Sequence, residues 1–528
     1  MTEHKMSRRS FVSKMGAVAV SPTIASGACG YAGPAPATSR ATGSKPDTSR
    51  QIEMTASEAV IAIADGRLSA ETYVRTLLAH GKAVSGYNAM ISWNDEEAIR
   101  VARSIDALRQ SGQQLPLLAG LPIVVKDNIN TKGLPTTGAT PALEHFVPTN
   151  DAWVVTRLIE AGAIVLGKAN MHELAFGITT TNFASFAGIA RNPYDSTRMV
   201  GGSSGGTGVA IAARIAPGGL GTDTGGSVRI PAALNGIAGL RPSVGNGGKE
   251  RRYDGTGVLP LSHTRDTVGP MGRTVEDVAL LDAAITRTDV ADSAPLRGLR
   301  LGIPTTYWDV VDAEVLSVMK TAMAKLEHAG VTFVEVDLPN VRSLAAKTGF
   351  RLVFHEAALD MPKYFAASGA TDITVERIAA AIANPDVKAG FQAVLQRSPA
   401  NEQEYANAVS VFRPAMRAQF DAYFKINAVD AILSPTTPLA AVHIDAEKGS
   451  STVSINGGPP VNEFETFIRN CDPGSIVGIP GITLPAGMTE GGLPVGISLD
   501  GPVGSDRQLL AIGISMERLL GTLPSPKT

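Results

Sequence analysis

Cysteine is almost absent from this chain of 528 residues, which contains only Cys29 and Cys471. At most one disulfide is possible and we expect none, so the fold is not one held together by disulfides. A basic excess is also lacking, because 47 lysines and arginines face 49 acidic residues and the formal net charge is −2. Nucleic acid is therefore not expected as a partner, since a phosphate backbone is bound by a basic surface.

No long hydrophobic run begins the chain either. The weakly apolar stretch of residues 15–28 is too short to span a bilayer and contains Pro22. It follows the basic segment SRRSFVSK, which resembles a twin-arginine export signal. We interpret residues 1–28 as such a signal and expect the protein in the periplasm or the cell envelope. Cleavage near Ala28 and a lipid anchor on Cys29 both remain open.

The rest of the chain has a linker and one long patterned region. Residues 29–50 are rich in Pro, Ala, Ser and Thr, which predicts a flexible linker. Residues 51–528 alternate helical and strand patterns, which predicts a single large α/β domain with a central twisted, mixed β-sheet surrounded by α-helices. The segment GLPIVVKDNI, which starts at residue 120, contains a short β-branched run after a proline and predicts a buried strand that ends in a polar turn. Residues 341–425 are expected to be mostly helical.

Two glycine-wrapped serine motifs stand out, GGSSGG at residues 201–206 and GTDTGGSVRIP at residues 221–231. A phosphate-binding P-loop is excluded, because Thr207 stands where the motif needs lysine. A nucleophile elbow fits the first motif but not the poor strand pattern before it, and it leaves the second motif unexplained. The zinc motif H-E-x-x-H is incomplete at both His172 and His355, so no metal and no cofactor are expected.

Acyl transfer accounts for both motifs. The amides of Thr224, Gly225 and Gly226 could converge on one oxyanion, with Ser227 as the nucleophile beside them. A serine needs a base, and Lys126 ends the predicted strand. It could act near neutral pH if burial lowered its pKa by roughly 3 units, with the first serine motif relaying the proton. A surface or salt-bridged lysine is the alternative.

Three segments, GLPIVVKDNI, GGSSGG and GTDTGGSVRIPAALNGIAGLRPS, resemble the amidase signature family in order and spacing. The likeness extends from about residue 56 to SIVGIPGITLPAGMTEGGLPVGISLDGP near the C-terminus. The resemblance implies a Ser–cis-Ser–Lys triad, with Lys126 as the base, Ser203 as the bridging cis-serine after Gly202, and Ser227 as the nucleophile. It implies supporting roles for four further residues, namely Ser204, Asp223, Arg229 and Asn128.

The substrate is less well defined by the sequence. The segment LPLSHTRDTVGPMGRTVEDVALLD is most similar to the arylalkyl amide branch of the family, the mandelamide and indoleacetamide hydrolases. The candidates for an apolar pocket, each of which could instead be core, are Phe176, Ile178, Thr179, Phe354 and Tyr364. The charged run at residues 249–252 could border the entrance or form a solvated loop. Cys471 is expected to be a buried small residue rather than a second nucleophile.

Several alternatives remain open within the family. The same triad cleaves esters, anilides and carbamates, so a carbamate (urethane) hydrolase is the nearest alternative to an amidase. A subunit of a tRNA-dependent amidotransferase is more distant, and the export signal and neutral charge argue against it. We expect a small-molecule substrate, no obligate protein partner and a monomer or homodimer.

Overall fold

The computed structural model describes residues 48–396 and 398–526. The predicted export signal, Cys29 and all but the end of the predicted linker lie outside these residues. The linker boundary needs a correction, because residues 48–50 begin helix α2 (Thr48–Ile52). This helix is held by tertiary contact, since the Thr76 hydroxyl donates to Gln51 Oε1 at 2.6 Å.

One mixed sheet of 11 strands forms the centre of the domain, in the order β1-β3-β2-β4-β6-β5-β12-β13-β9-β7-β8. Strand β2 pairs in parallel with β3 and β4, and β7 pairs in parallel with β8 and β9, while the remaining pairs are antiparallel. The strands are β1 Met90–Trp93, β2 Pro122–Lys126, β3 Ile164–Ala169, β4 Gly218–Asp223, β5 Ala238–Arg241, β6 Thr267–Gly272, β7 Arg300–Gly302, β8 Thr332–Val334, β9 Ala431–Pro435, β12 Gly481–Met488 and β13 Pro494–Asp500. A separate hairpin pairs β10 (Thr452–Val453) with β11 (Val461–Asn462).

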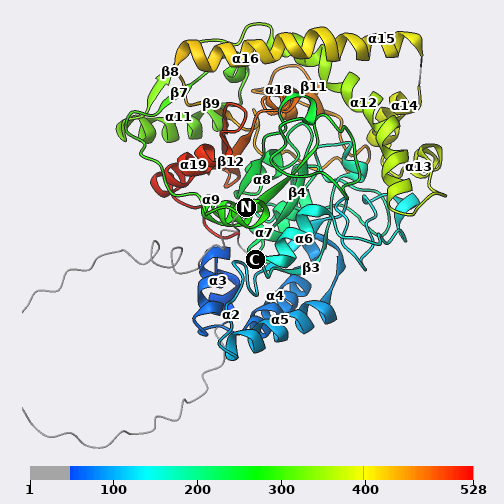
Figure 1. Cartoon of the computed structure of the whole chain (residues 1–528). Coiled ribbons are helices and arrows are strands. Elements are labelled where there is room, and N and C mark those ends of the chain that lie inside the picture. The colour runs from blue at the N-terminus through cyan, green and yellow to red at the C-terminus, as the bar shows by residue number, and fades with distance from the viewer. Residues whose placement is uncertain (1–47, 397, 527–528) are drawn as a thin grey trace, which may run out of the picture.

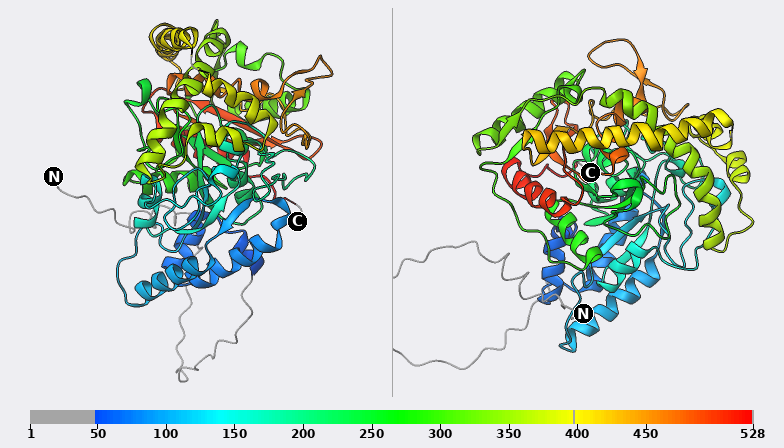
Figure 2. Two further views of the ribbon diagram at one scale, coloured as in Figure 1. Left: turned by 90° about the vertical axis from the view of Figure 1, so that its right-hand side faces the viewer. Right: turned by 45° about the horizontal axis from the view of Figure 1, so that its top comes forward.

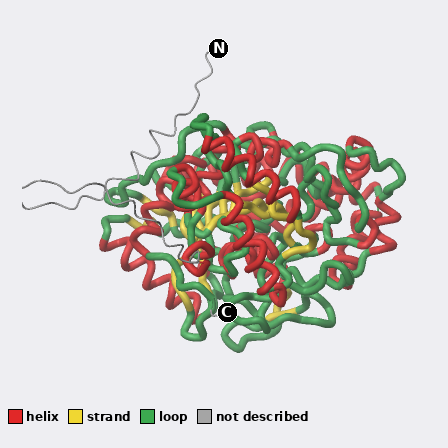
Figure 3. The backbone as a smooth tube through the Cα atoms, turned by 90° about the horizontal axis from the view of Figure 1, so that it is seen from below, coloured by secondary structure: helices red, strands yellow, loops and turns green. Residues whose placement is uncertain are grey.

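Helices surround this sheet, as Figures 1 and 3 show. The further α-helices are α3 Ala56–Ala64, α4 Ala70–Ala83, α5 Asp95–Gln110, α6 Trp153–Glu160, α7 Gly205–Ala212, α8 Arg229–Leu234, α9 Val275–Thr286, α10 Thr305–Trp308, α11 Ala313–His328, α12 Val341–Ala367, α13 Val375–Ala381, α14 Pro385–Leu395, α15 Pro399–Asn407, α16 Arg413–Asn427, α17 Glu463–Ile468, α18 Asp472–Val477 and α19 Asp506–Leu520. Short 3₁₀ turns are η1 Ser85–Tyr87, η2 Pro141–Leu143, η3 Glu173–Ala175 and η4 Asn246–Gly248, and a π-helical turn, η5 Ala408–Phe412, joins α15 to α16. The joined helices cross one side of the molecule as a single long rod (Figure 2).

Local sequence explains where these elements begin. Thr55 and Glu58 form a capping box at the start of α3, and Thr274 and Asp277 form another at the start of α9. Strand β2 has two parallel neighbours and is buried at every residue, as its continuous apolar run predicts. The α/β class and the mixed sheet are confirmed, and residues 341–425 are largely helical as expected.

The core consists of separate apolar clusters on either side of the sheet's midpoint. One cluster joins helices α3 to α6 to strands β2 and β3, and a second joins α9, α11 and α19 to β12 and β13. A third lies under α12, α13 and α14. No helix in residues 48–396 and 398–526 combines the length and apolar character needed to cross a membrane.

Candidate active site

Strand β2, which ends at Lys126, and strand β4, which leads into the loop of Ser227, end side by side. Strands β2 and β4 are parallel neighbours, with Ile123 opposite Gly218 and Val125 opposite Leu220. Because parallel strands place their carboxyl ends at one edge of a sheet, Lys126 at the end of β2 lies next to the end of β4. In open α/β sheets this edge is where ligands bind.

Lys126 is fully buried and has two polar contacts. Its Nζ donates to Ser203 Oγ and to Thr222 Oγ1, each at 2.7 Å. Asn128 Nδ2 donates to the same Thr222 oxygen at 3.1 Å, so this predicted supporting residue contacts the hydrogen-bond partner of Lys126. Burial lowers the pKa of Lys126 well below its usual value, although the charges of Asp223 and Asp266 oppose this shift. This lysine therefore loses its proton more readily than an exposed lysine does.

The first serine motif lies against these strand ends. The Gly202–Ser203 peptide bond is cis, as the family resemblance implies, and α7 begins two residues later. Ser204 Oγ donates to the carbonyl of Thr222 and accepts from its N–H, both at 3.2 Å, while the Ser204 N–H donates to the carbonyl of Ser227 at 3.2 Å. Ser204 thus connects the two motifs through hydrogen bonds.

Asp223 fixes the loop that contains Ser227. Its carboxylate accepts the N–H groups of Gly226 (2.8 Å) and Val228 (3.2 Å) and pairs with the guanidinium groups of Arg229 and Arg241 (each 3.1 Å). Burial alone would raise the pKa of Asp223, but the two arginines hold it well below its usual range. The loop is thereby held by a buried anion that stays charged.

One predicted oxyanion donor needs a correction. The N–H of Gly226 points back to Asp223, because the carboxylate captures it in the turn that the loop makes. Within the described part of the chain, the N–H groups of Thr224, Gly225 and Ser227 make no hydrogen bond. Thr224 and Gly225 therefore remain from the predicted set as free donors beside Ser227.

A cavity of about 270 Å³ opens beside this loop. Ser203 and Ser204 are fully buried, whereas Ser227 is only half-buried and borders the cavity. Much of the remaining wall is apolar and comes from distant parts of the chain. It includes Phe176, Ile178, Leu261, Phe350, Val353, Phe354, Phe464 and Ile468.

Three of the five predicted pocket residues, Phe176, Ile178 and Phe354, line this cavity. Thr179 and Tyr364 do not line it, which corrects the prediction. The Thr179 hydroxyl is used within the fold, donating to the carbonyl of Gly449 at 2.9 Å. Tyr364 is a buried residue of α12 in the third apolar cluster, where its hydroxyl donates to Asn130 Oδ1 at 2.5 Å.

Sequence reasoning missed several wall residues. Phe350 stands four residues before Phe354 on α12, so their shared helical face was a signal that could have been used. Phe464 is close in space to Phe350, with ring centroids 5.7 Å apart, but no local pattern indicated this. Arg265 and Asp472 also line the cavity and form an ion pair with each other.

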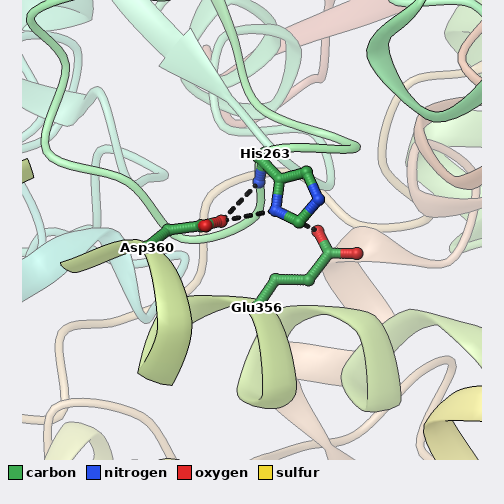
Figure 4. Close-up of side chains that lie close together, drawn as sticks. All are labelled: His263, Glu356 and Asp360. Carbon is green, nitrogen blue, oxygen red and sulfur yellow. Dashed lines mark hydrogen bonds and ion pairs between the residues drawn. The ribbon is translucent and has the colours of Figure 1, made fainter. Parts of the chain in front are cut away.

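The segment of residues 261–266 ties the nucleophile loop to α12. Glu356 accepts from Ser262 Oγ (2.5 Å), from the Thr264 N–H (3.1 Å) and from the Thr264 hydroxyl (3.0 Å), and Asp360 accepts from His263 Nδ1 at 2.6 Å (Figure 4). His263, Glu356 and Asp360 are close enough together to resemble a metal site. The Glu356 oxygens, however, already accept hydrogen bonds from the protein, so the cluster fits a structural junction between loop and helix.

The charged run of residues 249–252 and Cys471 do not line the cavity. None of residues 249–252 lines the cavity, since Arg252 pairs with Asp282 at 2.6 Å and Arg251 donates to backbone carbonyls. Cys471 is fully buried as expected, and burial raises the pKa of its thiol to about 12. A thiol with this pKa is not a nucleophile near neutral pH.

Comparison with known proteins gives a consistent result. The family described as Amidase matches residues 73–510. The indoleacetamide hydrolase of Agrobacterium vitis is 40% identical over 449 residues, covering 85% of this chain and 93% of that protein. The mandelamide hydrolase of Pseudomonas putida is 39% identical over 491 residues, covering 90% and 93%. A crystal structure of an amidase superposes with a TM-score of 0.78 and 32% identity, covering 89% of this chain and 100% of that one.

These alignments span most of the chain on both sides, and the shared fold places the mixed sheet and its helices in common with solved amidases. The chain therefore belongs to the amidase signature family and is an amidohydrolase that cleaves the C–N bond of amides.

Proposed function

We propose that the protein hydrolyses small arylalkyl amides through an acyl-enzyme formed on Ser227. The observation that carries this proposal is the buried Lys126 amine, whose Nζ lies 2.7 Å from Ser203 Oγ. Ser203 belongs to the motif that hydrogen-bonds to the loop of Ser227, and Ser227 borders the cavity. The aromatic wall of Phe176, Phe350 and Phe354 suits an aryl group. The relatives named for indoleacetamide and mandelamide support the same substrate class.

We infer the reaction from the position of Lys126 beside Ser203 and from the Ser–cis-Ser–Lys triad that the family resemblance implies. Ser227 Oγ attacks the amide carbon while its proton passes to Ser203, whose own proton passes to neutral Lys126. The N–H groups of Thr224 and Gly225 stabilise the oxyanion. The proton then returns through Ser203 to the leaving nitrogen, the C–N bond breaks and the amine departs. Water attacks the ester by the same route and releases the carboxylic acid, so no cofactor is required.

The test is hydrolysis of phenylacetamide by the purified full chain and its Ser227→Ala variant. We expect turnover by the wild type and a loss of more than about 10³-fold in the variant, because the nucleophile is absent. Ser450→Ala is the matched control, since Ser450 borders the same cavity. The corresponding ester, anilide and carbamate belong in the panel, and a higher kcat/KM for the carbamate would favour the urethanase alternative.

We further propose that residues 1–28 export the protein, on the basis of the SRRSFVSK segment. Replacing Arg8 and Arg9 by lysine in the native host should keep the protein in the cytoplasm, because the twin-arginine pathway reads that pair. Cell fractionation with activity assays measures this. An unchanged distribution between fractions would refute export by this route.

A further inference from the structure

The cavity beside Ser227 has more negative than positive side chains, and we propose that this imbalance selects the substrate by charge. Resting on the proposed function, the inference is that the enzyme takes uncharged and ammonium-bearing aryl amides and rejects amides that carry a carboxylate. Three carboxylates line the cavity, those of Asp386, Glu465 and Asp472. Arg265 is the single guanidinium, and no lysine from the described ranges borders the cavity.

Arg265 is not free to bind an anionic substrate. Its guanidinium pairs with Asp472 and donates to the carbonyl of Gly349 at 2.9 Å, and the side chain is only 2% exposed. Turning toward a ligand would leave Asp472 unpaired beside the nucleophile loop, and an unpaired buried charge is costly. This pair therefore contributes no net charge to the cavity.

Asp386 keeps its negative charge despite a neighbouring histidine. His172 Nδ1 accepts the N–H of Thr180 at 3.2 Å. The opposite nitrogen, Nε2, lies 3.2 Å from the Asp386 carboxylate. Burial alone would raise the pKa of Asp386, but the neighbouring His172 and the N–H of Val387 hold it below its usual value, so the carboxylate stays charged.

Glu465 supplies a further negative charge at the rim. It lies in the first turn of α17, is exposed, and forms no ion pair with any residue in the described ranges. Next to it, Phe464 contacts Phe350, whose ring centroid is 5.5 Å from that of Phe354. Carboxylates beside aromatic faces attract an ammonium group, while both repel a carboxylate.

The same imbalance bears on the product. Hydrolysis converts a neutral amide into a carboxylic acid, which ionises above about pH 4. The acid product then carries the charge that the cavity disfavours. We therefore expect weak product inhibition by arylacetates.

The experiment compares three amides that differ only in charge: phenylacetamide, its 4-aminomethyl derivative and its 4-carboxy derivative. We expect kcat/KM for the carboxy compound to be at least about tenfold below that of phenylacetamide, and that of the aminomethyl compound to be at least equal to it. Glu465→Gln should reduce severalfold the ratio of kcat/KM for phenylacetamide to kcat/KM for the carboxy compound. Added salt should reduce the same ratio in the wild type. Glu490→Gln, an exposed carboxylate outside the cavity, is the control and should leave the ratio unchanged.

Binding of the three compounds to Ser227→Ala, measured by calorimetry, separates this inference from the proposed function. Dissociation constants ordered by charge without any turnover of phenylacetamide by the wild type would overturn the function and leave the charge selection standing. Turnover of phenylacetamide with equal kcat/KM for the carboxy compound would overturn the charge selection alone. The charge selection would also be overturned if the ratio of kcat/KM for the neutral and carboxy compounds were the same in Glu465→Gln as in Glu490→Gln.

Discussion

The hydroxyl of Thr224 donates to Asp266 Oδ1 at 2.7 Å. The other oxygen of this half-buried carboxylate accepts the N–H groups of Leu261 (2.7 Å) and Ser262 (2.8 Å). Thr224 belongs to the loop that leads to Ser227, and its own N–H is one of the free donors beside the cavity. Asp266 therefore fixes the orientation of a peptide group that we propose stabilises the oxyanion.

Thr224→Val should lower kcat roughly tenfold with little change in KM, because the free donor loses its alignment while the aryl pocket stays intact. Steady-state kinetics on phenylacetamide measures both constants. Thr306→Val is the matched control, since Thr306 donates to Asp337 at 2.6 Å in an exposed threonine–aspartate pair. An equal effect in both variants, or a change confined to KM, would contradict the positioning role.

Asp266→Asn should move the acid limb of the pH profile of kcat to lower pH. Lys126 must be neutral to accept a proton, so kcat rises with pH through its pKa. Burial lowers that pKa, and the negative charges of Asp223 and Asp266 raise it part of the way back. Removing one of these charges lowers the pKa further. Asp289→Asn, an exposed aspartate, is the control, and a shift toward higher pH in Asp266→Asn would show that Lys126 is not the titrating base.

The two buried lysines should respond differently to substitution by methionine. Lys168 Nζ donates to the carbonyl of Ile129 (2.7 Å) and to Thr136 Oγ1 (2.9 Å) and lies 3.7 Å from Asp127, whose Oδ1 has no hydrogen bond among the described residues. Lys168→Met leaves Asp127 unpaired and should cost about 3–5 kcal/mol of unfolding free energy. Lys126 has no carboxylate within ion-pair distance in residues 48–396 and 398–526, so Lys126→Met should abolish turnover without that loss.

The lowered pKa of Lys126 gives a second reason to expect that its substitution does not reduce the free energy of unfolding. Between its lowered folded pKa and the usual value of 10.5, the unfolded chain binds a proton at this position that the folded protein does not. Lys126 therefore lowers stability in this window, and the penalty shrinks as pH rises. Denaturant unfolding of both variants near neutral pH measures the contrast. A strongly destabilised Lys126→Met protein would show that the amine is a structural group instead.

The sequence predicted those parts of the site that depend on a local residue pattern. The β-branched run before Lys126 predicted the buried strand β2, and the motif glycines predicted a tight loop before Ser227. The parallel pairing of β2 with β4 explains why Thr222 reaches Lys126, but the sequence does not state which strands pair. Thr222 was missed for that reason.

The cavity wall was the least predictable part. Phe464 and Asp472 meet α12 only because the chain returns after more than a hundred residues. The direction of the Gly226 N–H is likewise decided by the Asp223 carboxylate, which two arginines from different elements hold in place. Tertiary contacts of this kind leave no periodic trace in the sequence.

Gly226→Ala should destabilise the protein and reduce turnover together. Gly226 has a φ of +128°, which L side chains rarely adopt, and an added Cβ would lie 2.7 Å from the Cβ of Cys471. Backbone strain and overpacking each cost about 1–3 kcal/mol, so a loss of about 2–6 kcal/mol is expected with a displaced Ser227. Gly504→Ala is the control, because Gly504 also has a positive φ, +83°, but open space at its Cβ. Denaturant unfolding and kcat distinguish them: if Gly226→Ala is no more costly than Gly504→Ala, the contact with Cys471 does not constrain the nucleophile loop.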